Sequence, residues 1–168
     1  MLFINKISIL DIVEDTTVDG PGFRTSIYAA GCLHECPNCH NPESWDITNG
    51  HWKSIDEIME IIKKNKFANV TFSGGDPLFQ VDAFTELAKR IKVETSKSIW
   101  CYTGYRYEKL VNSKDLNKIL PYIDVLVDGR FIEAKKDLSL RFRGSSNQRI
   151  IDVQSSIKDK KVILLDLL

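Results

Sequence analysis

Strand-like and helix-like segments alternate along the chain, and this alternation most constrains its fold. Short segments rich in β-branched and aromatic residues predict strands over Phe23–Ala30, Asn69–Phe72, Ser98–Tyr102 and Ile123–Val127. Segments with apolar residues at helical spacing lie between them. Strands that alternate with helices form right-handed βαβ units around a parallel sheet. An α/β fold is therefore expected.

The helices are marked by capping and by periodicity. Ser54 begins an S-x-x-E capping box, and apolar residues follow it at i, i+3, i+4 and i+7 spacing. The same spacing returns after Asp82. Shorter helices are expected over Tyr107–Val111 and over Lys114–Leu120, where Pro121 should end the second one.

The length limits how many such units can form. At 168 residues the chain is expected to be a single domain spanning residues 1–168. A complete eight-unit barrel takes about 250 residues. We therefore expect a partial, incomplete β/α barrel of about five to six parallel strands.

Composition and charge limit which partners and which cellular location are expected. Lys and Arg number 23, as do Asp and Glu, so the formal net charge is zero and no nucleic-acid partner is expected. The apolar runs are far shorter than the roughly 20 residues of a membrane helix, so no membrane span is expected. The N-terminal segment lacks the pattern of a secretory signal, which predicts a cytoplasmic location.

Three of the four cysteines lie within eight residues. Cys32, Cys36 and Cys39 form a C-x3-C-x2-C run directly after an expected strand. In a reducing compartment such a cluster indicates metal ligands rather than disulfides. Three thiolates can hold three irons of a cubane iron–sulfur cluster, and the missing fourth ligand leaves one iron open to another group.

Two other sites are compatible with this spacing. One is a structural zinc site with Cys101, His34 or His40 as its fourth ligand. The other is an electron-transfer cluster completed by Cys101. Because Cys101 lies in the apolar run that begins at Ile99, we expect it to be a buried core residue instead.

The cysteine spacing is the hallmark of the radical S-adenosylmethionine (SAM) enzymes, and the resemblance extends over about residues 10–150. The cysteine run with its flanking segments resembles the glycyl-radical-enzyme activases. The further motifs resemble, in order and spacing, the anaerobic ribonucleoside-triphosphate reductase-activating proteins. The motifs are residues 20–24 (GPGFR), 73–78 (SGGDPL), 100–105 (WCYTGY), 125–131 (VLVDGRF) and 143–148 (RGSSNQ).

This resemblance implies a radical SAM type of partial barrel and an oxidoreductase activity. It implies a [4Fe-4S] cluster held by the three cysteines, with SAM chelating the fourth iron. Reductive cleavage of SAM to a 5'-deoxyadenosyl radical would then remove a glycine hydrogen from anaerobic ribonucleotide reductase, with an electron from a low-potential donor such as flavodoxin. The alternatives are an activase of a glycyl-radical lyase or, in another class, a non-catalytic iron–sulfur or zinc module.

The GGDP segment is expected to contact SAM. Gly74 and Gly75 follow an expected strand and would let the backbone come close to a ligand. Asp76 offers an acceptor for the methionine ammonium group. The alternative is a plain strand-to-helix turn in which Pro77 begins the next helix.

Thr103 and Asp128 end the next two expected strands. In parallel α/β sheets ligands gather outside the carboxyl ends of the strands. Their hydroxyl and carboxylate are therefore candidates for binding the ribose or the methionine of SAM, and equally for capping a helix or forming a turn.

The resemblance also places Arg24, with Asp76, among the catalytic residues, and Asn38, Cys39 and His40 beside the adenine. Asn38 stands where an aromatic residue is frequent in the wider superfamily, so adenine contact would come from backbone or from His40. Tyr28 replaces a frequent Phe, a conservative change. We expect residues 143–148 to contact a partner or a cofactor, but the sequence does not define the role of each residue.

Overall fold

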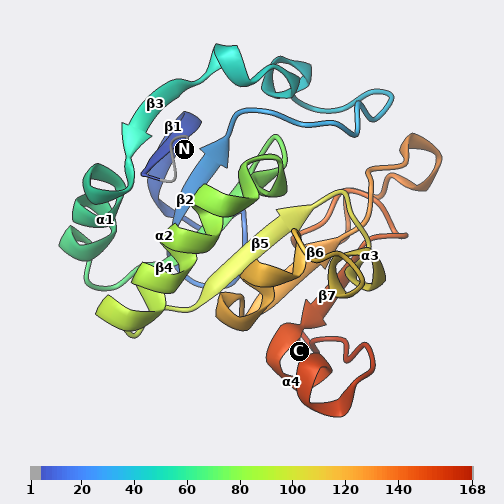
Figure 1. Cartoon of the computed structure of the whole chain (residues 1–168). Helices are drawn as coiled ribbons and strands as arrows, with labels where there is room; N and C mark the ends of the chain where they lie inside the picture. Colours follow the sequence, from blue (N-terminus) through green and yellow to red (C-terminus); the bar gives the residue numbers. More distant parts are fainter. Residues whose placement is uncertain (1–4, 168) are drawn as a thin grey trace.

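The computed structural model describes residues 5–167, which form a seven-stranded mixed sheet in the order β3-β1-β2-β4-β5-β6-β7 (Figure 1). The first four residues of the N-terminal segment, where no secretory signal is expected, lie outside this range. The strands are β1 Lys6–Thr16, β2 Arg24–Ala29, β3 His51–Ser54, β4 Asn69–Gly74, β5 Ile99–Thr103, β6 Val125–Asp128 and β7 Arg149–Asp152.

The α/β class with an incomplete barrel of parallel strands is confirmed, but the expected number of parallel strands is corrected. Within the described range, β2, β4, β5 and β6 run parallel to one another, whereas β1 pairs antiparallel with β2 and β3, and β7 pairs antiparallel with β6. There are thus four parallel strands rather than five to six. A turn joins β1 to β2, with Gly20 and Gly22 at φ values of 140° and 72°. The connection from β6 to β7 stays at the carboxyl edge, so β7 returns antiparallel.

The helices follow the sequence signals closely, with one correction. The α-helices are α1 Ile55–Lys64, α2 Val81–Glu94, α3 Tyr107–Val111 and α4 Val153–Asp159, and Ser54 forms the expected capping box of α1. The helix expected over Lys114–Leu120 is instead the 3-10 helix η4, Asn117–Tyr122. Pro121 lies inside it, because a short 3-10 segment tolerates a residue with no N–H to donate. No helix of residues 5–167 is long and apolar enough to cross a membrane.

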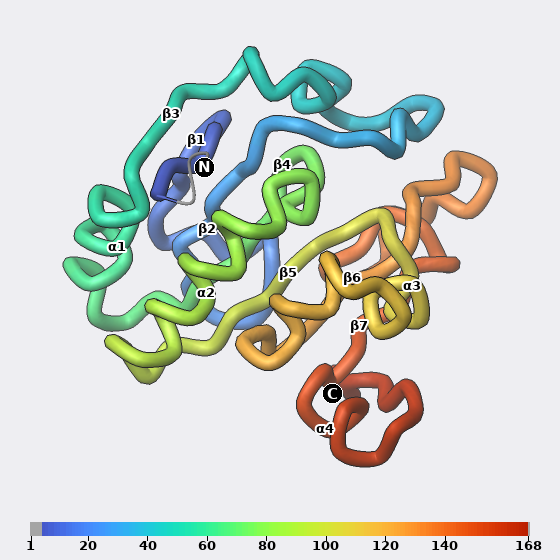
Figure 2. The backbone as a smooth tube through the Cα atoms, in the orientation of Figure 1, coloured from blue at the N-terminus to red at the C-terminus, as the bar shows by residue number. Residues whose placement is uncertain are grey.

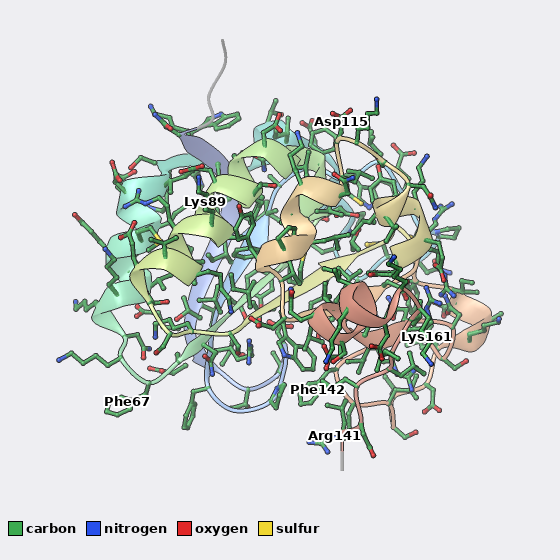
Figure 3. The ribbon with its side chains drawn as sticks, turned by 60° about the horizontal axis from the view of Figure 1, so that its bottom comes forward. Phe67, Lys89, Asp115, Arg141, Phe142 and Lys161 are labelled. Carbon is green, nitrogen blue, oxygen red and sulfur yellow. The ribbon has the colours of Figure 1, made fainter. Side chains whose placement is uncertain are left out.

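The two faces of the sheet are covered differently. Helices α1 and α2 pack their apolar sides on one face, where Phe72 of β4 meets Phe84 of α2 edge to face at 5.0 Å between ring centroids (Figure 1). Cys101 is fully buried in this helical core, as expected from its sequence context. On the other face, Trp100 contacts Phe142, which lies beside Arg141 in a loop between β6 and β7 (Figure 3).

Arg24 ties together the amino ends of two parallel strands. Its side chain is 1% exposed and donates to the backbone oxygen of Val70 at 2.8 Å, to Thr71 Oγ1 at 2.7 Å and to the backbone oxygen of Pro21 at 3.2 Å. Burial lowers the pKa of Arg24 to about 10, so the guanidinium remains charged at neutral pH. Because a buried charge is stable only when it is hydrogen-bonded, these contacts fix how β2 meets β4.

Replacing Arg24 with Met should lower the free energy of unfolding by about 2–4 kcal/mol, because buried acceptors lose their donors. Equilibrium urea unfolding followed by tryptophan fluorescence measures this change. Lys89→Met, at an exposed position of α2 (Figure 3), is the control and should change the free energy by less than about 0.5 kcal/mol. Equal stabilities of the Arg24→Met variant and the wild-type chain would contradict the structural role.

Candidate active site

A cavity of about 250 Å³ opens at the carboxyl ends of the parallel strands. This is the edge of a parallel α/β sheet where ligands are generally bound. Segments that follow β2, β4, β5 and β6 meet there. The lining residues are Cys32, His34, Cys36, Cys39, His40, Asn41, Ser73, Gly74, Gly75, Asp76, Tyr102, Thr103, Gly104, Val127, Gly129, Arg130, Phe131, Gly144 and Gln148.

The segment that carries the three cysteines forms one wall of this cavity. All three are free thiols, with Cys36 buried and Cys32 and Cys39 partly buried. The start of the segment is held by the N–H of Cys32, which donates to the backbone oxygen of Trp45 at 3.1 Å. Figure 2 shows this segment leaving β2 toward the segment after β6, where Arg130 donates to the backbone oxygen of His34.

The donor set fits a cluster with three protein ligands. Three thiols line one cavity, while Cys101 is buried in the core on the helical face of the sheet. Within residues 5–167, no three His, Cys, Asp or Glu side chains lie close enough together to hold one metal ion, as a mononuclear zinc site would require. Burial raises the pKa of the Cys32 thiol to about 11. Since thiolates are the ligands of iron, cluster binding must displace a proton from this thiol.

Asp76 joins three segments of the site. Its carboxylate is 2% exposed, and Oδ2 accepts from His34 Nε2 at 2.7 Å, from Thr103 Oγ1 at 2.8 Å and from the N–H of Gly104 at 3.0 Å. Oδ1 accepts from the N–H of Leu78 at 2.9 Å, which caps the 3-10 helix η3, Pro77–Gln80. Both carboxylate oxygens are thus bonded to the protein itself.

Gly74 and Gly75 allow close approach of backbone to backbone. A Cβ on Gly74 would lie 2.3 Å from the N atom of Ala29, and Gly74 has a φ of 99°. A Cβ on Gly75 would lie 2.5 Å from the backbone oxygen of Gly31. The GGDP turn can therefore pack against β2 and the start of the cysteine segment only without side chains at these positions.

Most of the expected SAM-binding residues line the cavity, but Asn38 and Asp128 do not. Asn38 adopts a left-handed conformation with a φ of 58°. Asp128 is fully buried and accepts from Arg149 Nε at 3.0 Å and from the N–H of Tyr107 at 2.8 Å. Asp128 thus orders the end of β6 and the start of β7.

Arg24, expected to be catalytic, lies at the opposite end of β2 from the cysteine segment and does not line the cavity.

Two other lining residues have contacts that the sequence did not predict. His34, considered from the sequence as a possible fourth zinc ligand, bonds to Asp76. Gln148 Oε1 accepts from the N–H groups of Gly144 and Ser145, and Gln148 Nε2 donates to the backbone oxygen of Gly129 at 3.0 Å. In the sequence, only the motif over residues 143–148 indicated that Gln148 contributes to the site. The residue types of this motif do not indicate which groups Gln148 contacts.

Replacing Cys32, Cys36 or Cys39 with Ala should abolish cluster binding, whereas Cys101→Ala should retain it, because only the first three thiols line the cavity. Iron and sulfide analysis after anaerobic reconstitution, with electron paramagnetic resonance, measures the outcome. Loss of the cluster in Cys101→Ala would favour a site with four cysteine ligands.

Comparison with known proteins agrees with this geometry. Residues 18–151 match the family described as 4Fe-4S single cluster domain. The chain is 39% identical over 141 residues to the anaerobic ribonucleoside-triphosphate reductase-activating protein of Vibrio cholerae, with 79% of this chain and 90% of that protein covered. The protein of the same name from Haemophilus influenzae is 40% identical over 143 residues, with 79% and 90% covered. That from Enterobacteria phage T4 is 34% identical over 141 residues, with 79% and 86% covered. The chain therefore belongs to the anaerobic ribonucleoside-triphosphate reductase-activating proteins, a radical SAM family with a 4Fe-4S single cluster domain.

Proposed function

We propose that this protein activates an anaerobic ribonucleoside-triphosphate reductase by forming a glycyl radical in it at the expense of SAM. The observation that carries the proposal is a cavity lined by three free thiols at the carboxyl edge of the sheet. Three protein ligands leave one position of a [4Fe-4S] cluster for another molecule. The similarity to relatives with that name supplies the substrate.

In this proposal Cys32, Cys36 and Cys39 hold three irons of the cluster. When bound, the cluster supplies the electron that cleaves SAM and so provides the radical that removes a glycine hydrogen. The contribution of the chain itself is placement. The cysteine segment is fixed at one wall, and the GGDP turn and the ends of β5 and β6 form the remainder.

We assign SAM to the space between the cysteines and the GGDP turn. Gly74, Gly75 and Thr103 line this space from the sheet side, and His40 lines it from the cysteine segment. His40 lies 5.2 Å from Phe131, between ring centroids, which gives the adenine an aromatic neighbourhood. The role of Asp76 is to shape this wall, because both its oxygens already accept hydrogen bonds from the chain.

The electron donor and the compartment complete the proposal. A low-potential carrier such as flavodoxin is the expected donor, since cleavage of SAM requires an external electron. A reducing, cytoplasmic compartment suits four cysteines that are all free thiols.

Reconstituted protein given reductant and SAM should form 5'-deoxyadenosine slowly, and added anaerobic ribonucleotide reductase should acquire a glycyl radical. Chromatography measures the nucleoside and electron paramagnetic resonance measures the radical. A reductase with the radical-bearing glycine changed to Ala is the control and should give no signal. A radical formed in a glycyl-radical lyase but not in the reductase would leave the chemistry intact and show that the assigned substrate is wrong.

A further inference from the structure

His34 has contacts that cluster binding by itself does not require. It lies between two cysteine ligands in sequence, but its side chain is only 12% exposed and points to the GGDP turn. His34 Nε2 lies 2.7 Å from Asp76 Oδ2. Because a carboxylate oxygen accepts hydrogen bonds, we assign Nε2 as the donor in this pair.

The surroundings of the imidazole are built to fit it. The ring of Tyr105 lies edge-on to it at 4.5 Å between centroids. A Cβ on Gly104 would lie 2.4 Å from His34 Cδ2, so the ring can occupy its position only beside a glycine. On the other side of the residue, Arg130 donates to the backbone oxygen of His34. Three separate segments thus hold this one residue.

The cysteine segment needs such an anchor. Glu35 and Asn38 have φ values of 46° and 58°, left-handed conformations that cost free energy for residues with a side chain. Backbone bonds hold the segment at its start, through Cys32, and at the later turn, where the N–H of Cys39 donates to the backbone oxygen of Cys36 at 3.0 Å. The contacts of His34 fall between these two points.

We propose that His34 is a positioning residue that fixes the cysteine segment against Asp76, so that the open side of the cluster faces the GGDP turn at the distance SAM requires. The inference rests on the proposed function, because SAM is the molecule that would bridge the two walls. His34 itself does not ligate iron and does not contact SAM. Its hydrogen bond sets the relative position of the groups that do.

The test compares two substitutions at His34 in the full reconstituted chain. His34→Phe keeps an aromatic ring against Tyr105 but removes the donor, whereas His34→Gln keeps an N–H donor of similar reach. His51→Phe, at an exposed position of β3, is the matched control. The Kd of SAM is measured by equilibrium dialysis, and the paramagnetic resonance spectrum of the reduced cluster is recorded with and without SAM.

His34→Phe should weaken SAM binding by about 10-fold and reduce the change that SAM causes in the cluster spectrum, because one charge-assisted hydrogen bond is lost. His34→Gln should restore the Kd to within about 3-fold of wild type. A wild-type Kd and spectral change in His34→Phe would overturn the proposal. So would a His34→Gln variant as weak as His34→Phe, since the hydrogen bond would then not be the cause.

A second substitution tests the same contact without changing either partner of the hydrogen bond. Gly104→Ala should displace the imidazole and weaken SAM binding in an otherwise wild-type chain. In a His34→Ala background the added methyl group meets no ring, so Gly104→Ala should have little further effect. Additive effects of the two substitutions would contradict the proposal even if His34→Phe fails to fold.

These outcomes are distinct from failure of the proposed function. If wild-type protein with a bound cluster forms no 5'-deoxyadenosine, the proposed function is wrong. If wild-type protein forms it and the His34 variants bind SAM normally, only the positioning role is wrong.

Discussion

The buried carboxylate of Asp76 is the interaction on which the arrangement of the site depends. Removing an ionised carboxylate from water is costly unless donors replace the water. Here four donors do so, and they come from the cysteine segment, from the end of β5 and from the first turn of η3. Moving any one of these segments would leave a buried charge with fewer partners. The walls of the cavity are therefore held in one relative position.

The parallel sheet brings these segments together in the first place. Ala29 of β2 is in register with Gly74 of β4, and Thr103 of β5 with Asp128 of β6. The strands thus end at one level, and each continues into a segment of the site. Because the helical face is filled by an apolar core, the cavity can form only at this edge and toward the other face. Rigid strands then position groups on irregular segments, the usual division between scaffold and site.

Local signals in the sequence predicted what local interactions determine. The capping box at Ser54, the strands β2, β4, β5 and β6, and the cysteine run each depend on neighbours within a few residues, and the structure contains them all. The strands β1, β3 and β7 were missed, since their antiparallel pairing depends on which sheet edges remain free. From the motifs alone, Thr103 and Asp128 were equal candidates for binding SAM. Their position at the end of a strand does not show which distant residues they contact.

Those distant partners also explain why two buried aspartates at the same edge play different roles. Asp128 faces the guanidinium of Arg149, so its charge is compensated and it serves to join β6 to β7. Asp76 is bonded to a hydroxyl, to backbone amides and to an imidazole, with no guanidinium beside it. The electrostatic field of its negative charge therefore reaches the cavity. Burial is the main cause of the raised pKa of Cys32, and the charge of Asp76 raises that pKa further. A negative field opposes a thiolate but favours a cation, and SAM carries an ammonium and a sulfonium group. The same carboxylate that holds the walls in place thus makes the cavity electrostatically suited to a cationic ligand.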